Sequence, residues 1–556
     1  MPGVRFTSAR PSLVCWIFGV STLTVVSGPG ELLAGGNAPF IVGKITIVQR
    51  PVFDDNDTTT VGTVGRIANS VHVLTDPDVI RRELLFKEGD PYDQRLVDET
   101  SRHLRALNFI GDVRITNDTL PDNTINMTVS SRDRWSLRPD MSVRQGGGAT
   151  GFGVAVREDN LFWNGQKVSV GYNRLSGQPN PNGGEVTFAE PRIYGSWWKT
   201  SLQYISSDEL RQSSVDVERP LFADTATWAV RAFAGSGRVG IRQYADAELV
   251  REAYIDQENE LAWVASSSGE ETKLQIAAAY VRTRSRADTF QLRPFDNVDL
   301  AIGSISMFHR EYYKSNHLEN FGRVEDVPVG YQAGVAVGRN LHFTAAGSAD
   351  YFFRVFGQAS LHAGEDFFGG YQASLNSYLV GKEADEMSFT ATALQHWRWA
   401  PLQTLLARMT TTIGFHWAPT SQVTLGSFSG LRGYRYYQLS GQRLFVVNLE
   451  DRSFSALKIW FVKFGGAVFF DSGVVWTDGG LAGQRFHSAA GFGLTVESGK
   501  NLGSGIFRID IAYNFDRRSI GLNFSSDHLF KAFSDLEFLP PLPASAPVSE
   551  ENIHQR

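Results

Sequence analysis

The sequence predicts an all-β transmembrane barrel preceded by a small α+β domain, and the spacing of apolar residues carries this prediction. From about residue 139 onward, apolar and polar residues alternate with a period of two in many separate stretches. Before that point, helical spacing is interleaved with short strand-like runs. The composition agrees, because 54 Gly, 38 Phe, 17 Tyr and 12 Trp are typical of barrels with tight turns and aromatic girdles.

The alternation is clearest in residues 507–515, near the end of the barrel region. Its odd-numbered residues are apolar, whereas its even-numbered residues include Arg508 and Asp510. A soluble sandwich with an apolar interior would show the same period. The barrel is favoured because aromatics often end the apolar rows and full charges stand in the polar rows. The region also extends over residues 136–530 without a helical interlude.

Residues 38–135 are predicted to form the α+β domain. Asp76 followed by Pro77 is a capping residue with proline in the first turn, which predicts a helix start. A second helix is expected from Asp90-Pro91, because apolar residues then recur at spacings of three and four. Strands are expected at residues 45–48, 113–116 and 125–129.

Residues 1–36 have the order of a secretory signal peptide. Arg5 and Arg10 precede an apolar run, Leu13 to Val26, and small residues follow at 33–36. A membrane anchor is the alternative, but the run is shorter than the roughly 20 apolar residues that a spanning helix needs. Cys15, the one cysteine of the sequence, lies in this segment. The mature chain is therefore expected to have neither a disulfide nor a cysteine–zinc site.

The remaining bulk features restrict the class of partner. The formal net charge is -6, so no basic excess indicates nucleic-acid binding. No segment after the signal is apolar enough to span a membrane as a helix. Residues 531–556 contain LPPLPASAP followed by acidic residues, which predicts a disordered C-terminal tail.

Three runs in the barrel region resemble the BamA/TamA superfamily of outer-membrane assembly and transport proteins. They are GLRGYRYY at 430–437, LFVVNLEDRSF at 444–454 and GAVFFDSGVVW at 466–476. The first resembles the signature of the long sixth extracellular loop, which folds back into the barrel. The other two resemble the strands that follow it. This resemblance implies about sixteen antiparallel strands with both chain ends in the periplasm of a Gram-negative bacterium.

The N-terminal domain resembles one polypeptide-transport-associated (POTRA) domain, on the runs VIRRELLFKEGDPYD, LRALNFIGDVRI and INMTVSSRDRW. Two features depart from well-known members of the superfamily. Those members often carry several such domains, whereas one is found here. Their last strand usually ends the protein, whereas about 26 residues follow Phe530 here.

The resemblance implies a latch between the loop and the barrel interior. Alternation places Glu450 and Asp471 on the polar faces of their strands, which line the lumen in a barrel. A guanidinium pairs well with carboxylates, so Arg432 is predicted to bind Asp471, Glu450 or both. An ordinary glycine turn with a solvated arginine is the alternative. The full set of candidate latch residues is Gly430, Leu431, Arg432, Gly433, Tyr434, Glu450 and Asp471.

Other candidate sites are weaker. Asp54, Asp55 and Asp57 lack the glycine and distal glutamate of a calcium loop. No G-x-S-x-G nucleophile motif is present. Glu365-Asp366 and Glu383 with Asp385 are interpreted as solvated loop charges, and the histidines lack metal-ligand spacing. The histidines considered are His309, His317, His342, His362, His396 and His416. We therefore expect no catalytic residue, no metal, no cofactor and no enzymatic activity.

The expected function is a non-enzymatic factor that helps insert or export polypeptides at the outer membrane. Its expected partners are outer-membrane lipids, unfolded client polypeptides and accessory periplasmic proteins. A passive outer-membrane pore or a surface receptor is the alternative. A pore needs an open lumen, so a loop held inside the barrel would count against it.

Overall fold

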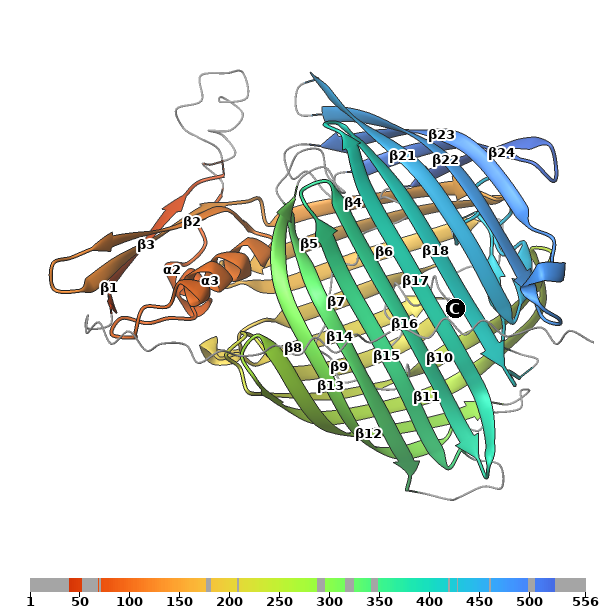
Figure 1. Ribbon diagram of the computed structural model, residues 1–556, viewed down its shortest axis with the longest axis horizontal. Helices are drawn as coiled ribbons and strands as arrows, with labels where there is room; N and C mark the ends of the chain where they lie inside the picture. Colours follow the sequence, from red (N-terminus) through yellow and green to blue (C-terminus); the bar gives the residue numbers. More distant parts are fainter. Residues whose placement is uncertain are drawn as a thin grey trace, which may run out of the picture.

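The structure is a computed structural model with a small domain at the N-terminus and a large β-barrel after it (Figure 1). It describes residues 40–52, 69, 72–176, 182–207, 210–287, 296–315, 325–341, 349–418, 421–427, 429–459, 462–498 and 506–525. The predicted signal peptide, the predicted tail and the aspartates at 54, 55 and 57 lie outside these residues. No described helix is long and apolar enough to cross a membrane, a finding that does not bear on β-barrels.

The N-terminal domain packs two helices on a three-stranded sheet of order β1-β3-β2. Strand β1 runs parallel to β3 and β2 runs antiparallel to it. Asp76 caps the first helix through Asp78 N, with Pro77 at its first position, as the sequence predicts. The second helix begins later than expected, because Asp93 rather than Asp90 is its cap. The elements are β1 Ile41–Arg50, α2 Pro77–Arg82, α3 Gln94–Ala106, β2 Ile110–Thr119 and β3 Thr124–Asp133.

The core of this domain lies between its helices and its sheet. Ile80 on α2, Leu104 on α3 and Val129 on β3 are completely buried there. The central strand, β3, alternates buried and partly accessible residues along its whole length, which gives the helices one apolar face of the sheet to pack against. The domain therefore has a hydrophobic core of its own, made of Val42, Ile45, Ile80, Leu84, Phe86, Val97, Leu104, Ile125, Met127 and Val129.

In the described part of the chain, twenty antiparallel strands form one closed barrel. The all-β barrel after a small α+β domain is therefore confirmed, but the expected number of about sixteen strands is wrong. The strands are β4 Leu137–Gly146, β5 Ala149–Leu161, β6 Gln166–Ser176, β7 Gly183–Glu190, β8 Lys199–Ser207, β9 Leu210–Arg219, β10 Trp228–Ala245, β11 Glu248–Ser268, β12 Thr272–Ala287, β13 Val298–Ser315, β14 Glu325–Asn340, β15 Tyr351–Ala363, β16 Phe367–Val380, β17 Glu383–Ala400, β18 Gln403–Phe415, β21 Arg443–Ile459, β22 Val462–Trp476, β23 His487–Ser498, β24 Ile506–Asn514 and β25 Ser519–Ser525.

The long loop that carries Arg432 connects β18 to β21 and contains a short hairpin, β19 Val423–Leu425 with β20 Leu439–Gly441. We call it the latch loop, residues 416–442. Fifteen barrel strands precede it and five follow it. Since β4 starts at the N-terminal domain, the connections after the first, third and each later odd-numbered barrel strand lie at the far end of the barrel. The latch loop is then the eighth far-end connection, not the sixth, because more strands precede it than the resemblance implied.

The outer face of the barrel is apolar along most strands. On β25, Ile520 and Leu522 are exposed, while Asn523 between Leu522 and Phe524 is buried. On β22, Val468 is 66% exposed, whereas the next residue, Phe469, is buried. An exposed apolar face of this extent is costly in water and suits the hydrocarbon core of a membrane. The barrel is therefore built to span a membrane with its strands.

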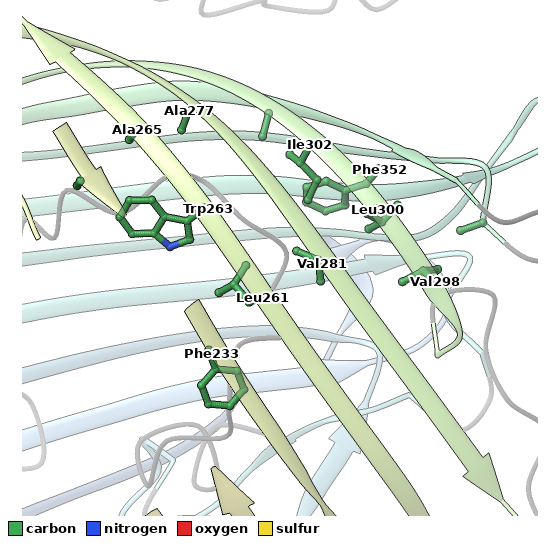
Figure 2. Close-up of a cluster of buried hydrophobic side chains, with 13 residues drawn as sticks. Phe233, Leu261, Trp263, Ala265, Ala277, Val281, Val298, Leu300, Ile302 and Phe352 are labelled. Carbon is green, nitrogen blue, oxygen red and sulfur yellow. The ribbon is translucent and has the colours of Figure 1, made fainter. Parts of the chain in front are cut away.

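The inner face is not uniformly polar. On β11, Leu261, Trp263 and Ala265 are buried, whereas Val264 between them is half exposed on the outside. Inward side chains of β10 to β15 join them in one hydrophobic cluster, part of which Figure 2 shows across neighbouring strands. Charged residues on the polar faces of several strands predicted a lumen lined by polar side chains. Part of the inner wall is instead apolar, because inward residues that pair across neighbouring strands are both apolar. Leu261 on β11 opposite Val281 on β12 is an example.

The N-terminal domain lies against the near-end turns of the barrel. Arg192 donates to Glu83 over 2.5 Å, and its guanidinium lies 4.1 Å from the ring centroid of Trp197. On α3, Glu99 Oε1 accepts a hydrogen bond from the backbone N–H of Asp224. Burial raises the pKa of Glu83 despite the neighbouring Arg192. Burial, with Arg192 nearby, lowers the pKa of His103 to about 4. The junction therefore holds ionisable groups that the barrel turns shield from water.

The separate core predicts that residues 38–135 fold without the barrel. A purified fragment of these residues should be soluble and monomeric and should unfold in one cooperative transition in urea. Circular dichroism at increasing urea would measure this. A fragment with a disordered spectrum in buffer would show that the domain depends on the barrel turns for its structure.

Candidate latch between the loop and the barrel wall

Arg432 stands inside the barrel with 1% of its surface exposed. Its Nε donates to Asp471 Oδ2 at 2.7 Å and its Nη2 donates to Asp471 Oδ1 at 2.8 Å. The backbone N–H of Arg432 also donates to Asp471 Oδ2, at 3.2 Å. The pair is therefore a two-pronged guanidinium–carboxylate contact, which a lysine cannot reproduce. The Arg432 guanidinium also lies 3.4 Å from the ring centroid of Phe469.

Glu450 is the second anchor, and it is shared. Arg432 Nη1 donates to Glu450 Oε2 at 2.8 Å. Arg508 on β24 donates to both Glu450 oxygens, at 2.7 and 2.8 Å, and Arg452 Nε donates to Glu450 Oε1 at 2.8 Å. Arg508 in turn binds Asp510. Three guanidiniums therefore face three carboxylates in a buried network that joins the latch loop to β21, β22 and β24.

The other predicted latch residues also lie at this site. Gly430 and Gly433 have φ values of +120° and +81°, which favour glycine. The carbonyl of Gly430 accepts from Asn448 Nδ2 at 2.6 Å, and the carbonyl of Gly433 accepts from Asn514 Nδ2 at 3.1 Å. Leu431 is fully buried in a small apolar cluster with Leu425, Leu444 and Val446.

Tyr434 holds the far side of the turn. Its hydroxyl donates to Asp516 Oδ2 at 2.7 Å and to the carbonyl of Ser488 at 3.0 Å. Burial disfavours the charged form of Asp516, but hydrogen bonds from Tyr434 and His487 outweigh it and lower its pKa. The structure therefore brings all seven predicted residues together, and the solvated-turn alternative does not describe Arg432.

Four members of the network were not among the predicted site residues: Arg452, Arg508, Asp510 and Asn448. Their sequence signal was present, because alternation places Arg508 and Asp510 on the polar face of β24. What the alternation could not show is the register between strands. The close approach of β24 to Glu450 depends on how the loop and five strands meet in three dimensions.

The remaining candidates do not form a second site. Among the described residues, no group of three or more His, Cys, Asp or Glu could hold a metal ion. His309, His362 and His416 contact backbone carbonyls at turns, His396 is buried beside Phe368, and His317 and His342 lie outside the described residues. Glu365 and Asp366 are exposed at a turn, where Arg398 pairs with both.

Comparison with known proteins identifies the N-terminal domain. Residues 66–132 match the POTRA family, described as "Surface antigen variable number repeat". The predicted POTRA-like character of the N-terminal domain is therefore confirmed for these residues. No curated protein matches the sequence.

Solved structures that resemble the chain include BamA and CdiB proteins. BamA from Haemophilus ducreyi lacking POTRA domains 1–3 aligns at 12% identity and a TM-score of 0.38, covering 88% of this chain and 84% of that one. CdiB from Acinetobacter baumannii aligns at 10% identity and a TM-score of 0.43, covering 88% and 73%. CdiB from Escherichia coli aligns at 10% identity and a TM-score of 0.44, covering 90% and 92%.

The network predicts a strong coupling between Arg432 and Asp471. Arg432→Ala should lower barrel stability by about 3 kcal/mol, because it leaves the buried Asp471 without its guanidinium partner. Arg432→Lys should recover little of this loss. A double-mutant cycle with Asp471→Ala, measured by detergent-resistant melting, should show effects that are clearly less than additive.

Arg435 provides the matched control, because it lies on the same loop but pairs with the exposed Glu248. Arg435→Ala should change stability by at most about 1 kcal/mol, as surface pairs do. Additive effects in the Arg432–Asp471 cycle, and in the corresponding cycle with Glu450→Ala, would contradict the latch.

Proposed function

We propose that this protein is a non-enzymatic outer-membrane factor that helps insert or export polypeptides, with its POTRA domain in the periplasm. The observation that supports this most is the latch loop itself. A loop fixed inside the barrel by Arg432 occupies part of the lumen, whereas a passive pore needs a continuous water path. Its clients would be unfolded polypeptides, and accessory periplasmic proteins would act at the POTRA domain.

The POTRA domain offers a surface for such clients. Among the residues that the structure describes, strand β2 lies at one edge of its sheet and pairs with β3 alone. The outer end of β2, residues 117–119, is exposed. An extended polypeptide can add a strand to an open edge through backbone hydrogen bonds, without needing a particular sequence. This supports a role in handling many clients rather than one small ligand.

A passive pore or receptor remains the second candidate, and the strand count favours it. Barrels of 16 to 18 strands already leave an aqueous channel in porins, and this barrel has twenty. The buried network blocks one side of such a lumen, near β21 to β24. The two functions therefore differ in whether the rest of the lumen conducts ions.

Localisation is the first expected outcome. The mature protein should fractionate with the outer membrane and should migrate faster in electrophoresis when unheated than when boiled, because closed barrels resist detergent. Antibody detection in separated fractions measures both. Recovery of the protein in the soluble periplasmic fraction would contradict the proposal.

Depletion tests the function. Loss of the protein should reduce the amount of a subset of outer-membrane or exported proteins, measured by quantitative proteomics. An Arg432→Ala chain should restore them less well than an Arg435→Ala chain, because only the former breaks the latch. An unchanged proteome, together with steady single-channel conductance of the purified barrel, would instead establish the pore.

A further inference from the structure

The barrel closes where its last strand meets its first. In the described residues, the register between β25 and β4 consists of Phe524 opposite Gln145, near the far-end tip of β4. By contrast, β4 pairs with β5 from Leu137 to Gly146. We call the junction of β25 with β4 the seam. Its far end therefore lies close to the β4–β5 turn.

The latch loop contacts the β25 side of the seam through its backbone at Gly433 and through the Ser427 side chain. A Cβ atom at Gly521 on β25 would lie 3.0 Å from Gly433 Cα, so the two glycines pack directly on each other. Ser427 Oγ donates to Asn523 Oδ1 on the same strand at 2.8 Å. Asn523 is buried, although it is one residue from the seam pair. The loop thus lies on the last strand where that strand reaches the seam.

The same loop contacts the β4 side at Gly147, in the β4–β5 turn. Tyr436 N donates to the carbonyl of Gly147 at 3.1 Å. A Cβ atom at Gly147 would lie 2.5 Å from Tyr436 N and 2.7 Å from Tyr434 O, both backbone atoms. Side chains cannot move aside here, because the obstacle is the loop backbone. The contact therefore requires glycine.

We propose that the latch loop is a staple across the seam, and that Gly147 is the residue that positions its β4 side. One loop holds the first hairpin through a backbone hydrogen bond to Gly147. It holds the last strand through backbone packing on Gly521 and the Ser427 side chain on Asn523. The far end of the seam cannot separate until the loop releases one of these two sides. The inference rests on the proposed function in one respect: entry of a client polypeptide is the reason for the seam to open.

The next residue, Gly148, provides a matched control. Both glycines have positive φ values, +60° at Gly147 and +86° at Gly148, so alanine strains the backbone at either position. A Cβ atom at Gly148 meets nothing within 4 Å. The difference between Gly147→Ala and Gly148→Ala therefore measures the loop contact and not the turn strain.

Two measurements on the full-length barrel compare these variants: the temperature at which compact migration in detergent is lost, and the rate of tryptic cleavage at the loop residue Arg435. We expect Gly147→Ala to melt at a clearly lower temperature than Gly148→Ala and to be cleaved several-fold faster. Equal melting and equal cleavage of the two variants would overturn the proposal.

A covalent lock on the seam completes the test. Gln145→Cys with Phe524→Cys places two thiols at the registered pair. When the disulfide between these two cysteines is formed, the Gly147→Ala variant should melt at the same temperature as the disulfide-locked barrel with Gly147. Its latch loop should still be cleaved by trypsin at Arg435. A loss that persists in the locked barrel would mean that Gly147 acts only within its turn, and would overturn the staple. If the Gly147→Ala barrel does not assemble without the disulfide, the two cysteines are introduced into that variant. Restored assembly supports the staple, because seam closure was then the defect. Assembly that stays lost overturns it.

Neither measurement uses a client polypeptide. A negative result in the depletion experiment therefore leaves the seam result standing, and a negative seam result leaves the proposed function standing.

Discussion

One buried guanidinium joins the latch loop to the barrel wall. Arg432 comes from a loop, yet it is anchored to two strands by charge-assisted bonds to Asp471 and Glu450. Charges this deeply buried are costly unless each has its partners, so the network tolerates few other arrangements. The position of the loop backbone follows from that requirement, and with it the positions of Tyr434 against β23 and of Gly433 against β25. A barrel without this anchor would lose the main reason for the loop to enter the lumen.

Much of this could be predicted from sequence, because period-two alternation directly reports which side of a strand a residue faces. Alternation gave the inward orientation of Glu450 and Asp471, and capping residues gave the start of the first POTRA helix at Pro77. Local patterns of this kind depend on neighbours in the chain. They can therefore be recognised in the sequence without knowledge of the three-dimensional arrangement.

Other features depend on contacts between distant segments. The strand count was taken from a resemblance and was too low, since alternation indicates that a segment is a strand but does not give the number of strands that close the barrel. Arg508 and Asp510 faced the right way in the sequence, but their approach to Glu450 depends on register across the barrel. The apolar inner wall at Trp263 was missed for a related reason. Alternation assigns neighbouring residues to opposite faces of a strand, but it does not show which of two apolar residues faces the lumen.

The balance of charge in the network has a consequence for the state in which the loop has left the lumen. With the loop in place, Arg432, Arg452 and Arg508 offset Glu450, Asp471 and Asp510. Withdrawal of Arg432 leaves two cations beside three anions, and the wall it vacates becomes acidic. Water and counterions would then enter to screen the excess, and the affinity of that wall for cations would fall as ionic strength rises. The open barrel would in this way present a cation-attracting surface that the closed barrel conceals.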